Sequence, residues 1–167
     1  MAYSFSQLSL PSNAPTAENR ATAVSPNGKW LVTAGGGTGN LLVFKKSGLN
    51  FVYDHTETGV IGASTVYGLA WSPDSNFLAV SDGTSVRRLF AVNQTTGVLT
   101  AQTLDTAGAG ASWSCNFHPT LSNYVVFCGN SSPFIQIFKR SGTTSTWNLV
   151  ASSTVSMGNT TGAGWNA

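Results

Sequence analysis

VYGLAWSPDSNFLAVSDGT, from Val66 to Thr84, decides the fold, because blurred copies of this stretch stand on either side of it along the chain. One copy is ATAVSPNGKWLVTAGGGTGN, from Ala21 to Asn40, and the other is WSCNFHPTLSNYVVFCGNSS, from Trp113 to Ser132. Each copy contains a short apolar strand, a turn with a proline, a second apolar strand and a turn with glycine. The sequence therefore predicts a repeated all-β unit.

Two independent sets of landmarks give the length of the repeat. Its prolines recur after 47 and 46 residues and its phenylalanines after 46 and 48 residues, at Pro26, Pro73 and Pro119 and at Phe44, Phe90 and Phe138. Each unit has room for four short strands in meander order. Four strands in about 40 to 50 residues are typical of a β-propeller blade, whereas a β-sandwich gives no reason for a fixed period.

The middle copy resembles a WD40-like β-propeller repeat, through Trp71, Pro73 and the WSPD motif that contains them, followed by FLAVSDGT at 77–84. The resemblance extends over about residues 20–155 and implies the architecture rather than a function. It departs from the family in two ways. The Trp-Asp pair that often ends the third strand reads FK, FA and FK (44–45, 90–91 and 138–139), and the Gly-His pair before the first strand is missing. The family's His–Asp network is therefore not carried over, although Asp82 stands where its turn aspartate would be.

We expect an all-β chain of about three full blades with one extra strand at each end. The segments are an N-terminal strand and linker in 1–19, blades in 20–64, 65–112 and 113–161, and the first strand of a further blade in 162–167. A ring needs at least four blades, so three leave an open arc with uncovered faces. We therefore expect other protein subunits as partners and a solution mass above that of one protomer. Either further copies of the chain close a ring, or the arc docks on a larger assembly, or the chain is a partial one.

The composition limits the partners further. Only 8% of the residues are charged, against about 25% in an average soluble domain, and the formal net charge is +2. Nothing in this balance requires nucleic acid as a partner. No apolar run approaches the roughly 20 residues that span a bilayer, and residues 1–15 do not have the pattern of a signal peptide. We expect the protein in a virion or in the cytoplasm.

The residues that carry chemistry are sparse and scattered. His55 and His118 are about one and a half repeats apart, and the six acidic residues form no close pair on one strand. Cys115 and Cys128 do not have the paired spacing of a zinc site, so we expect two buried thiols, with a cross-strand disulfide as the alternative. We predict no catalytic residue, no metal site and no cofactor, and hence no enzyme.

Two pairs of basic residues occupy the same position in their repeats, at Lys45 and Lys46 and at Lys139 and Arg140. They are candidates for binding acidic partners or glycans, and solvated turn positions are the interpretation that we prefer. The tryptophans, Trp30, Trp71, Trp113, Trp147 and Trp165, raise the possibility of a lectin, but packing between neighbouring sheets is the ordinary role of such residues.

These observations lead to one main prediction of function and two alternatives. A composition poor in charge and rich in serine, threonine, asparagine and glycine resembles that of phage virion proteins. The prediction is a non-enzymatic structural or docking protein that uses a propeller scaffold for protein–protein interaction, as a tail or capsid-attached component. The alternatives are an oligomeric sugar-binding propeller and a propeller hydrolase of the lactonase type.

Overall fold

The computed structural model describes residues 18–36, 40–61, 65–83, 87–105 and 111–153. The strands expected at 3–10 and 162–167 lie outside these residues. Within them the predicted fold class is confirmed, because every element is a strand and the strands form three antiparallel four-stranded meanders. No helix that could cross a membrane occurs in the described ranges.

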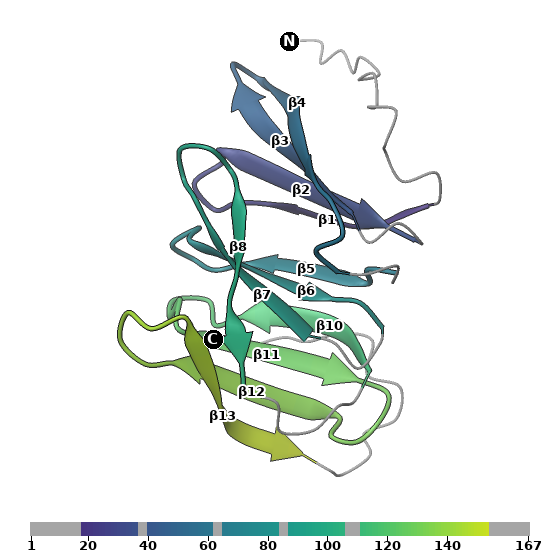
Figure 1. The fold of residues 1–167 in the computed structure, drawn as a ribbon, viewed down its shortest axis with the longest axis vertical. Helices are drawn as coiled ribbons and strands as arrows, with labels where there is room; N and C mark the ends of the chain where they lie inside the picture. The colour runs from purple at the N-terminus through teal and green to yellow at the C-terminus, as the bar shows by residue number, and fades with distance from the viewer. Residues whose placement is uncertain (1–17, 37–39, 62–64, 84–86, 106–110, 154–167) are drawn as a thin grey trace.

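The three sheets lie one below another in Figure 1, in chain order. The first sheet consists of β1 (Asn19–Val24), β2 (Trp30–Gly35), β3 (Leu41–Ser47) and β4 (Asn50–Glu57). The second consists of β5 (Gly68–Trp71), β6 (Phe77–Ser81), β7 (Arg87–Val92) and β8 (Leu99–Ala101). The third consists of β10 (Ser112–Phe117), β11 (Tyr124–Gly129), β12 (Ile135–Arg140) and β13 (Thr146–Ser153), and β9 (Thr103–Leu104) pairs parallel with β13 at its edge.

The turn between the first and second strands explains why serine precedes proline in two of the repeats. In the second sheet, Ser72 Oγ accepts a hydrogen bond from the backbone N of Phe77 at 2.9 Å. In the first sheet, Ser25 Oγ accepts one from the backbone N of Trp30 at 3.0 Å. The next polar residue, Asp74 or Asn27, accepts a backbone N–H through its side-chain oxygen in each turn, at 3.0 Å. Both turns thus satisfy their backbone donors in the same way.

The core consists of two apolar layers, one between each pair of neighbouring sheets. Trp30 and Phe90 belong to the layer between the first and second sheets, and Phe138 and Trp147 to the layer between the second and third. The phenylalanine landmarks and three of the tryptophans are at most 8% exposed: Phe44, Phe90, Phe138, Trp30, Trp71 and Trp147. These three tryptophans pack in the core, as predicted.

Neighbouring sheets approach each other at their first strands, where β5 packs against both β1 and β10. Gly68 allows the approach to β10, since a Cβ at this position would lie only 3.3 Å from the Cα of Ser114. Farther along, equivalent backbone N–H groups of the proline turns reach the next sheet. Asn27 donates to Ser75 Oγ at 3.0 Å, and Asp74 donates to Ser122 Oγ at 3.1 Å.

Both cysteines are free and buried, and the register excludes a disulfide between them. Cys115 pairs with Phe127 and Cys128 pairs with Ser114 in the ladder between β10 and β11. Paired residues share a face and consecutive residues alternate, so the two thiols point to opposite faces of the sheet. The alternative of a cross-strand disulfide is therefore wrong, because the side chains cannot meet.

Candidate functional site

A row of three side chains connects the first strands of the three sheets. Arg20 lies in β1, Tyr67 immediately precedes β5, and Trp113 lies in β10. Each stands six residues before the proline of its own repeat, so the three positions are equivalent. We call Arg20, Tyr67 and Trp113 the axial row, because it runs along the edge at which the sheets converge.

The axial row is held by ring contacts. The rings of Tyr67 and Trp113 stack with centroids 4.8 Å apart and planes inclined by 20°. The guanidinium carbon of Arg20 lies 5.5 Å from the centroid of the Tyr67 ring, within the range of a cation–π interaction. Gly83 has a φ of +68°, and a Cβ at this position would collide with the Tyr67 ring. The glycine therefore makes room for the central member of the row.

The axial row offers several functional groups to a ligand. The side chains of Arg20 and Glu18 are 46% and 83% exposed, and Glu18 Oε2 lies 3.4 Å from Arg20 Nη2. Tyr67 and Trp113 are half-buried. The indole Nε1 of Trp113 is buried and has no hydrogen-bond partner in the described part of the chain, so the ring face is what Trp113 offers to a ligand. A flat aromatic surface, a cation and a carboxylate are thus close together along one edge.

Asp82, the predicted turn aspartate, lies beside the row and is buried, at 1% exposure. Burial lowers the pKa of the neighbouring Arg87, and the carboxylate of Asp82 counteracts part of this effect by attraction. The carboxylate of Asp82 therefore stabilises the charged form of the half-buried Arg87, and this role is structural.

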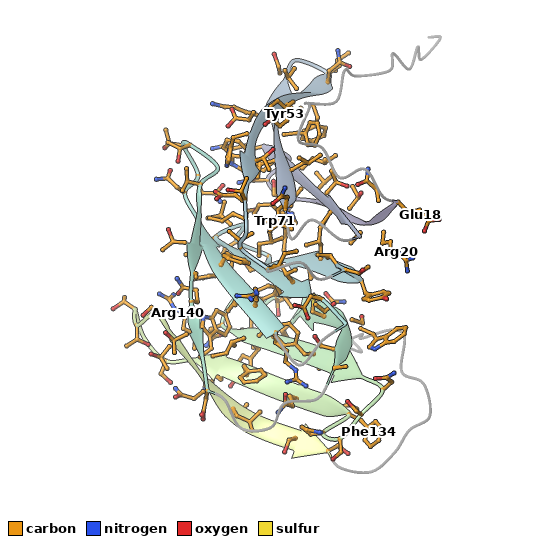
Figure 2. All side chains as sticks on the ribbon, turned by 45° about the vertical axis from the view of Figure 1, so that its right-hand side comes forward. Glu18, Arg20, Tyr53, Trp71, Phe134 and Arg140 are labelled. Carbon is orange, nitrogen blue, oxygen red and sulfur yellow. The ribbon has the colours of Figure 1, made fainter. Side chains whose placement is uncertain are left out.

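The predicted basic pairs lie at the end of the sheets opposite to the axial row. In Figure 2, Arg20 of the row and Arg140 of one basic pair lie on opposite sides of the molecule. Lys45 and Lys46 lie in the last part of β3, and Lys139 and Arg140 end the equivalent strand β12. The two pairs share a rim but do not meet. Lys45 and Lys46 line a groove between the first and second sheets, whereas Arg140 lines a groove between the second and third.

One cluster was missed by the sequence analysis. His55 in β4 contacts Asp54 Oδ2 through Nδ1 at 2.7 Å and Glu57 Oε1 through Nε2 at 3.3 Å. The register explains this arrangement, because Val43 pairs with His55 and Phe44 pairs with Tyr53, which leaves Asp54 as the extra residue of a β-bulge. Glu57 Oε1 also accepts the backbone N–H of Leu99 at 2.9 Å, so this carboxylate joins two sheets.

In the described residues, no three His, Cys, Asp or Glu side chains form a group that could hold a metal ion. The axial row is therefore the arrangement with the most varied chemistry. The sequence does place the three residues of the row at the same distance before the prolines of their repeats. Their equivalence was missed because arginine, tyrosine and tryptophan are different residue types.

Comparison with known proteins identifies the repeat. The family described as "WD domain, G-beta repeat" matches residues 54–87, from β4 of the first sheet to the start of β7 in the second. A structure of the Cps50 (Swd1) β-propeller domain from Myceliophteria thermophila also matches, with 14% identity, a TM-score of 0.56, and coverage of 74% of this chain and 38% of that one. The repeats are WD40-like β-propeller blades. Blades 1, 2 and 3 are the first, second and third sheets, and the predicted resemblance is confirmed.

Two further matched structures carry lactonase descriptions. One is provisionally described as a 6-phosphogluconolactonase, from Bacteroides uniformis, with 23% identity and a TM-score of 0.71, and it covers 84% of this chain and 42% of its own. The other is the periplasmic gluconolactonase of Pseudomonas aeruginosa, with 20% identity, a TM-score of 0.68, and coverage of 85% and 41%. At these identities the likeness establishes the propeller fold.

The chain spans about two fifths of the length of the structures that it matches. The comparison with curated protein sequences gave no match. WD40-like propellers generally mediate contacts between proteins, and the repeat match names no partner.

The lactonase matches correct our main prediction of function. We expected a non-enzymatic structural or docking protein of a phage virion and no enzyme. That prediction is wrong, because the propellers that this chain resembles include enzymes that act on lactones, and nothing in the comparisons supports a virion protein. The prediction failed because it relied on amino-acid composition, which affects solubility and says little about catalytic activity.

Proposed function

We propose that this chain is part of a propeller enzyme of the lactonase type and that it binds a sugar lactone along the axial row. The observation that carries the proposal is the contact of Arg20 with the Tyr67 ring and the stacking of this ring on Trp113, at the starts of the first strands of three successive blades. Ligand sites combine an apolar or aromatic surface with a few polar groups that fix orientation. The axial row has this composition, and the lactonase likeness of the blades points to the substrate class.

The chemistry of lactone hydrolysis fits Arg20 of the axial row and its ion-pair partner Glu18. Water adds to the carbonyl carbon, the bond from this carbon to the ring oxygen breaks, and the ring oxygen takes up a proton to give a hydroxy acid. A carboxylate such as Glu18 can accept the proton of the attacking water, and the guanidinium of Arg20 can stabilise the oxyanion that develops. The rings of Tyr67 and Trp113 would position the sugar.

The test measures acid release from gluconolactone and 6-phosphogluconolactone by the intact chain, against the rate in buffer. Arg20→Gln is expected to lower kcat/KM by about 100-fold or more, because an oxyanion loses its charged donor. Glu18→Gln is expected to lower kcat, and Trp113→Phe mainly to raise KM. Lys139→Ala, a charge change at the opposite end of blade 3, serves as the control. Rates equal to those of buffer for both lactones, or an undiminished Arg20→Gln variant, would contradict the proposal.

A complete ring is part of the same proposal. Three blades do not close around an axis, and the matched structures are more than twice as long as this chain. We propose that further blades, from a second copy or from another polypeptide segment, complete the site on the open side of the axial row. Native mass spectrometry of the active species is the measurement. Full activity from a single three-bladed protomer would contradict this part of the proposal.

A further inference from the structure

A groove on the rim between blades 1 and 2 gathers three of the eight basic residues of the chain. Its volume is about 540 Å³, and its walls come from both blades. We call it the lysine groove, and its lining consists of Lys29, Trp30, Lys45, Lys46, Gly48, Gln94 and Thr95.

The positions of the lysines are fixed by the backbone. Lys46 N donates to the carbonyl oxygen of Lys29 at 2.8 Å, which brings the end of β3 against the start of β2. Lys45 lies opposite Trp30 in the ladder, with Nζ 5.6 Å from the centroid of the indole ring. Across the groove, the amide of Gln94 is held by Asn27 Nδ2, which donates to its Oε1 at 2.7 Å.

The lining of the lysine groove contains no carboxylate. None of its three lysines forms an ion pair within the described part of the chain. The acidic residue Asp54 lines an adjacent cleft with Lys45 and Lys46, and its Oδ2 lies 2.7 Å from His55 Nδ1. Lys29, Lys45 and Lys46 are exposed, and their like charges create a local positive potential along the groove that a bound anion would neutralise.

The equivalent groove between blades 2 and 3 shows that the fold does not require these charges. Its volume is about 460 Å³. Where blade 1 has Lys29, Lys45 and Lys46, blade 2 has Asn76, Ala91 and Val92, as the equivalent bond from Val92 N to Asn76 O at 2.8 Å confirms. This second groove contains one cation, Arg140, and one carboxylate, Asp74. It is therefore balanced, whereas the lysine groove carries three positive charges.

From these observations we propose that the lysine groove binds a small phosphorylated ligand with two or more negative charges. Ammonium groups are compact point charges that suit phosphate oxygens. The volume lies within the range of small-molecule sites, which favours a small anion over an extended acidic peptide. The proposal goes beyond the proposed function, since the groove and the axial row lie at opposite ends of the blades.

The chain offers a matched pair of variants for the test. Lys45 and Lys139 occupy equivalent positions, and each lies over the ring of its cross-strand neighbour, at 5.6 Å from Trp30 and 5.1 Å from Tyr124. Only Lys45 lines the lysine groove. Lys45→Ala and Lys139→Ala therefore each remove one positive charge and one contact with an aromatic ring, but only Lys45→Ala changes the lysine groove.

The experiment titrates pyrophosphate, inorganic phosphate and hexaglutamate into the chain by calorimetry at about 0.15 M salt. Pyrophosphate is expected to bind more tightly than phosphate. Lys45→Ala should weaken its binding roughly 10-fold, as the loss of one charge-assisted contact does, and Lys139→Ala should leave it unchanged. The triple variant Lys29→Asn, Lys45→Ala and Lys46→Val should abolish binding. It carries the residues that blade 2 already has, so the fold should tolerate it.

Three results would overturn the proposal. The first is the absence of pyrophosphate binding. The second is a loss of binding in Lys139→Ala as large as that in Lys45→Ala, which would indicate attraction by net charge alone. The third is tighter binding of hexaglutamate than of pyrophosphate, which would indicate an acidic protein segment as the occupant.

Discussion

The indole Nε1 of Trp71 donates a hydrogen bond across the blade boundary to the backbone oxygen of Ala23, at 3.2 Å. Trp71 belongs to the motif that marks the repeat, and its ring is 8% exposed. The residue therefore contributes to the joint between blades 1 and 2, both through this bond and through its packing in the apolar layer between them.

Replacing Trp71 by Phe should lower the free energy of unfolding by about 1 to 3 kcal/mol. The variant keeps an aromatic ring but removes the indole donor from the oxygen of Ala23 and opens a small void. Denaturant unfolding followed by circular dichroism measures the change. Val150→Ala, at a position 51% exposed in blade 3, is the control and should change stability little. Equal stability of the Trp71→Phe variant and the parent would contradict a role in the joint.

Gly68→Ala tests the approach of the first strands. The added methyl group would lie 2.6 Å from Ser81 Oγ and 3.3 Å from the Cα of Ser114, so β5 and β10 would have to separate. Overpacking of this kind costs about 1 to 3 kcal/mol, measured as a shift in the denaturant midpoint. Gly28→Asn is the control, because Gly28 has open space around it and asparagine tolerates its φ of +69°. Similar losses in both variants would argue against close packing at Gly68.

Asp74 should make stability depend on pH in the acid range. Partial burial raises its pKa, but hydrogen bonds from Ser72, Asn76 and Ser122 outweigh this effect and hold the pKa below its ordinary value of 3.8. A carboxyl group with a lowered pKa in the folded state stabilises the fold above its unfolded pKa, and the contribution is lost as the pH falls through the folded value.

The parent should therefore be more stable than Asp74→Asn at pH 6, and the difference should shrink below about pH 4. The substitution places in blade 2 the residue that blade 1 has at the equivalent position, Asn27, so the turn should survive. A difference that is independent of pH between 2 and 6, a range set by ordinary carboxyl titration, would contradict this assignment.

The two thiols should be unreactive in the folded protein. Burial raises the pKa of Cys115 to about 12, with hydrogen bonds to Ser81 acting weakly in the opposite direction. Burial also raises the pKa of Cys128. Since the thiolate is the reactive form, Ellman's reagent at pH 8 should label neither cysteine in buffer and both in denaturant. Rapid labelling of Cys115 in buffer would show that blades 2 and 3 open around it.

The sequence predicted the repeat because its cause is local. Serine, proline and a polar residue build the same turn in blades 1 and 2, and the buried phenylalanines follow from the alternation of the strands. Positions that depend on contacts between blades were not visible in the same way. Arg20, Tyr67 and Trp113 have different side chains, and only the packing of three sheets makes them one row.

The cluster around His55 was missed for a different reason. Strand alternation places Asp54 and His55 on opposite faces, and a single extra residue in the ladder brings the carboxylate to the imidazole. The sequence contains no local signal for this bulge. The lysine groove likewise could not be predicted, since Lys29 stands apart from Lys45 and Lys46 along the chain and joins them only through the pairing of β2 with β3.

Gly83→Ala should disturb the axial row although none of its three members is substituted. Position 83 has a φ of +68°, which strains any residue with a side chain other than asparagine or aspartate, and its methyl group would push against the Tyr67 ring. The ring can yield only by leaving its stack on Trp113, so the half-buried indole should become more exposed. The expected readout is stronger quenching of tryptophan fluorescence by acrylamide, together with weaker binding of gluconolactone. Gly142→Ala carries the same backbone strain, at a φ of +63°, with no atom near the added methyl group, and it should change neither signal. If Gly83→Ala and Gly142→Ala behave alike, backbone strain alone explains the effect and the contact with Tyr67 does not order the row.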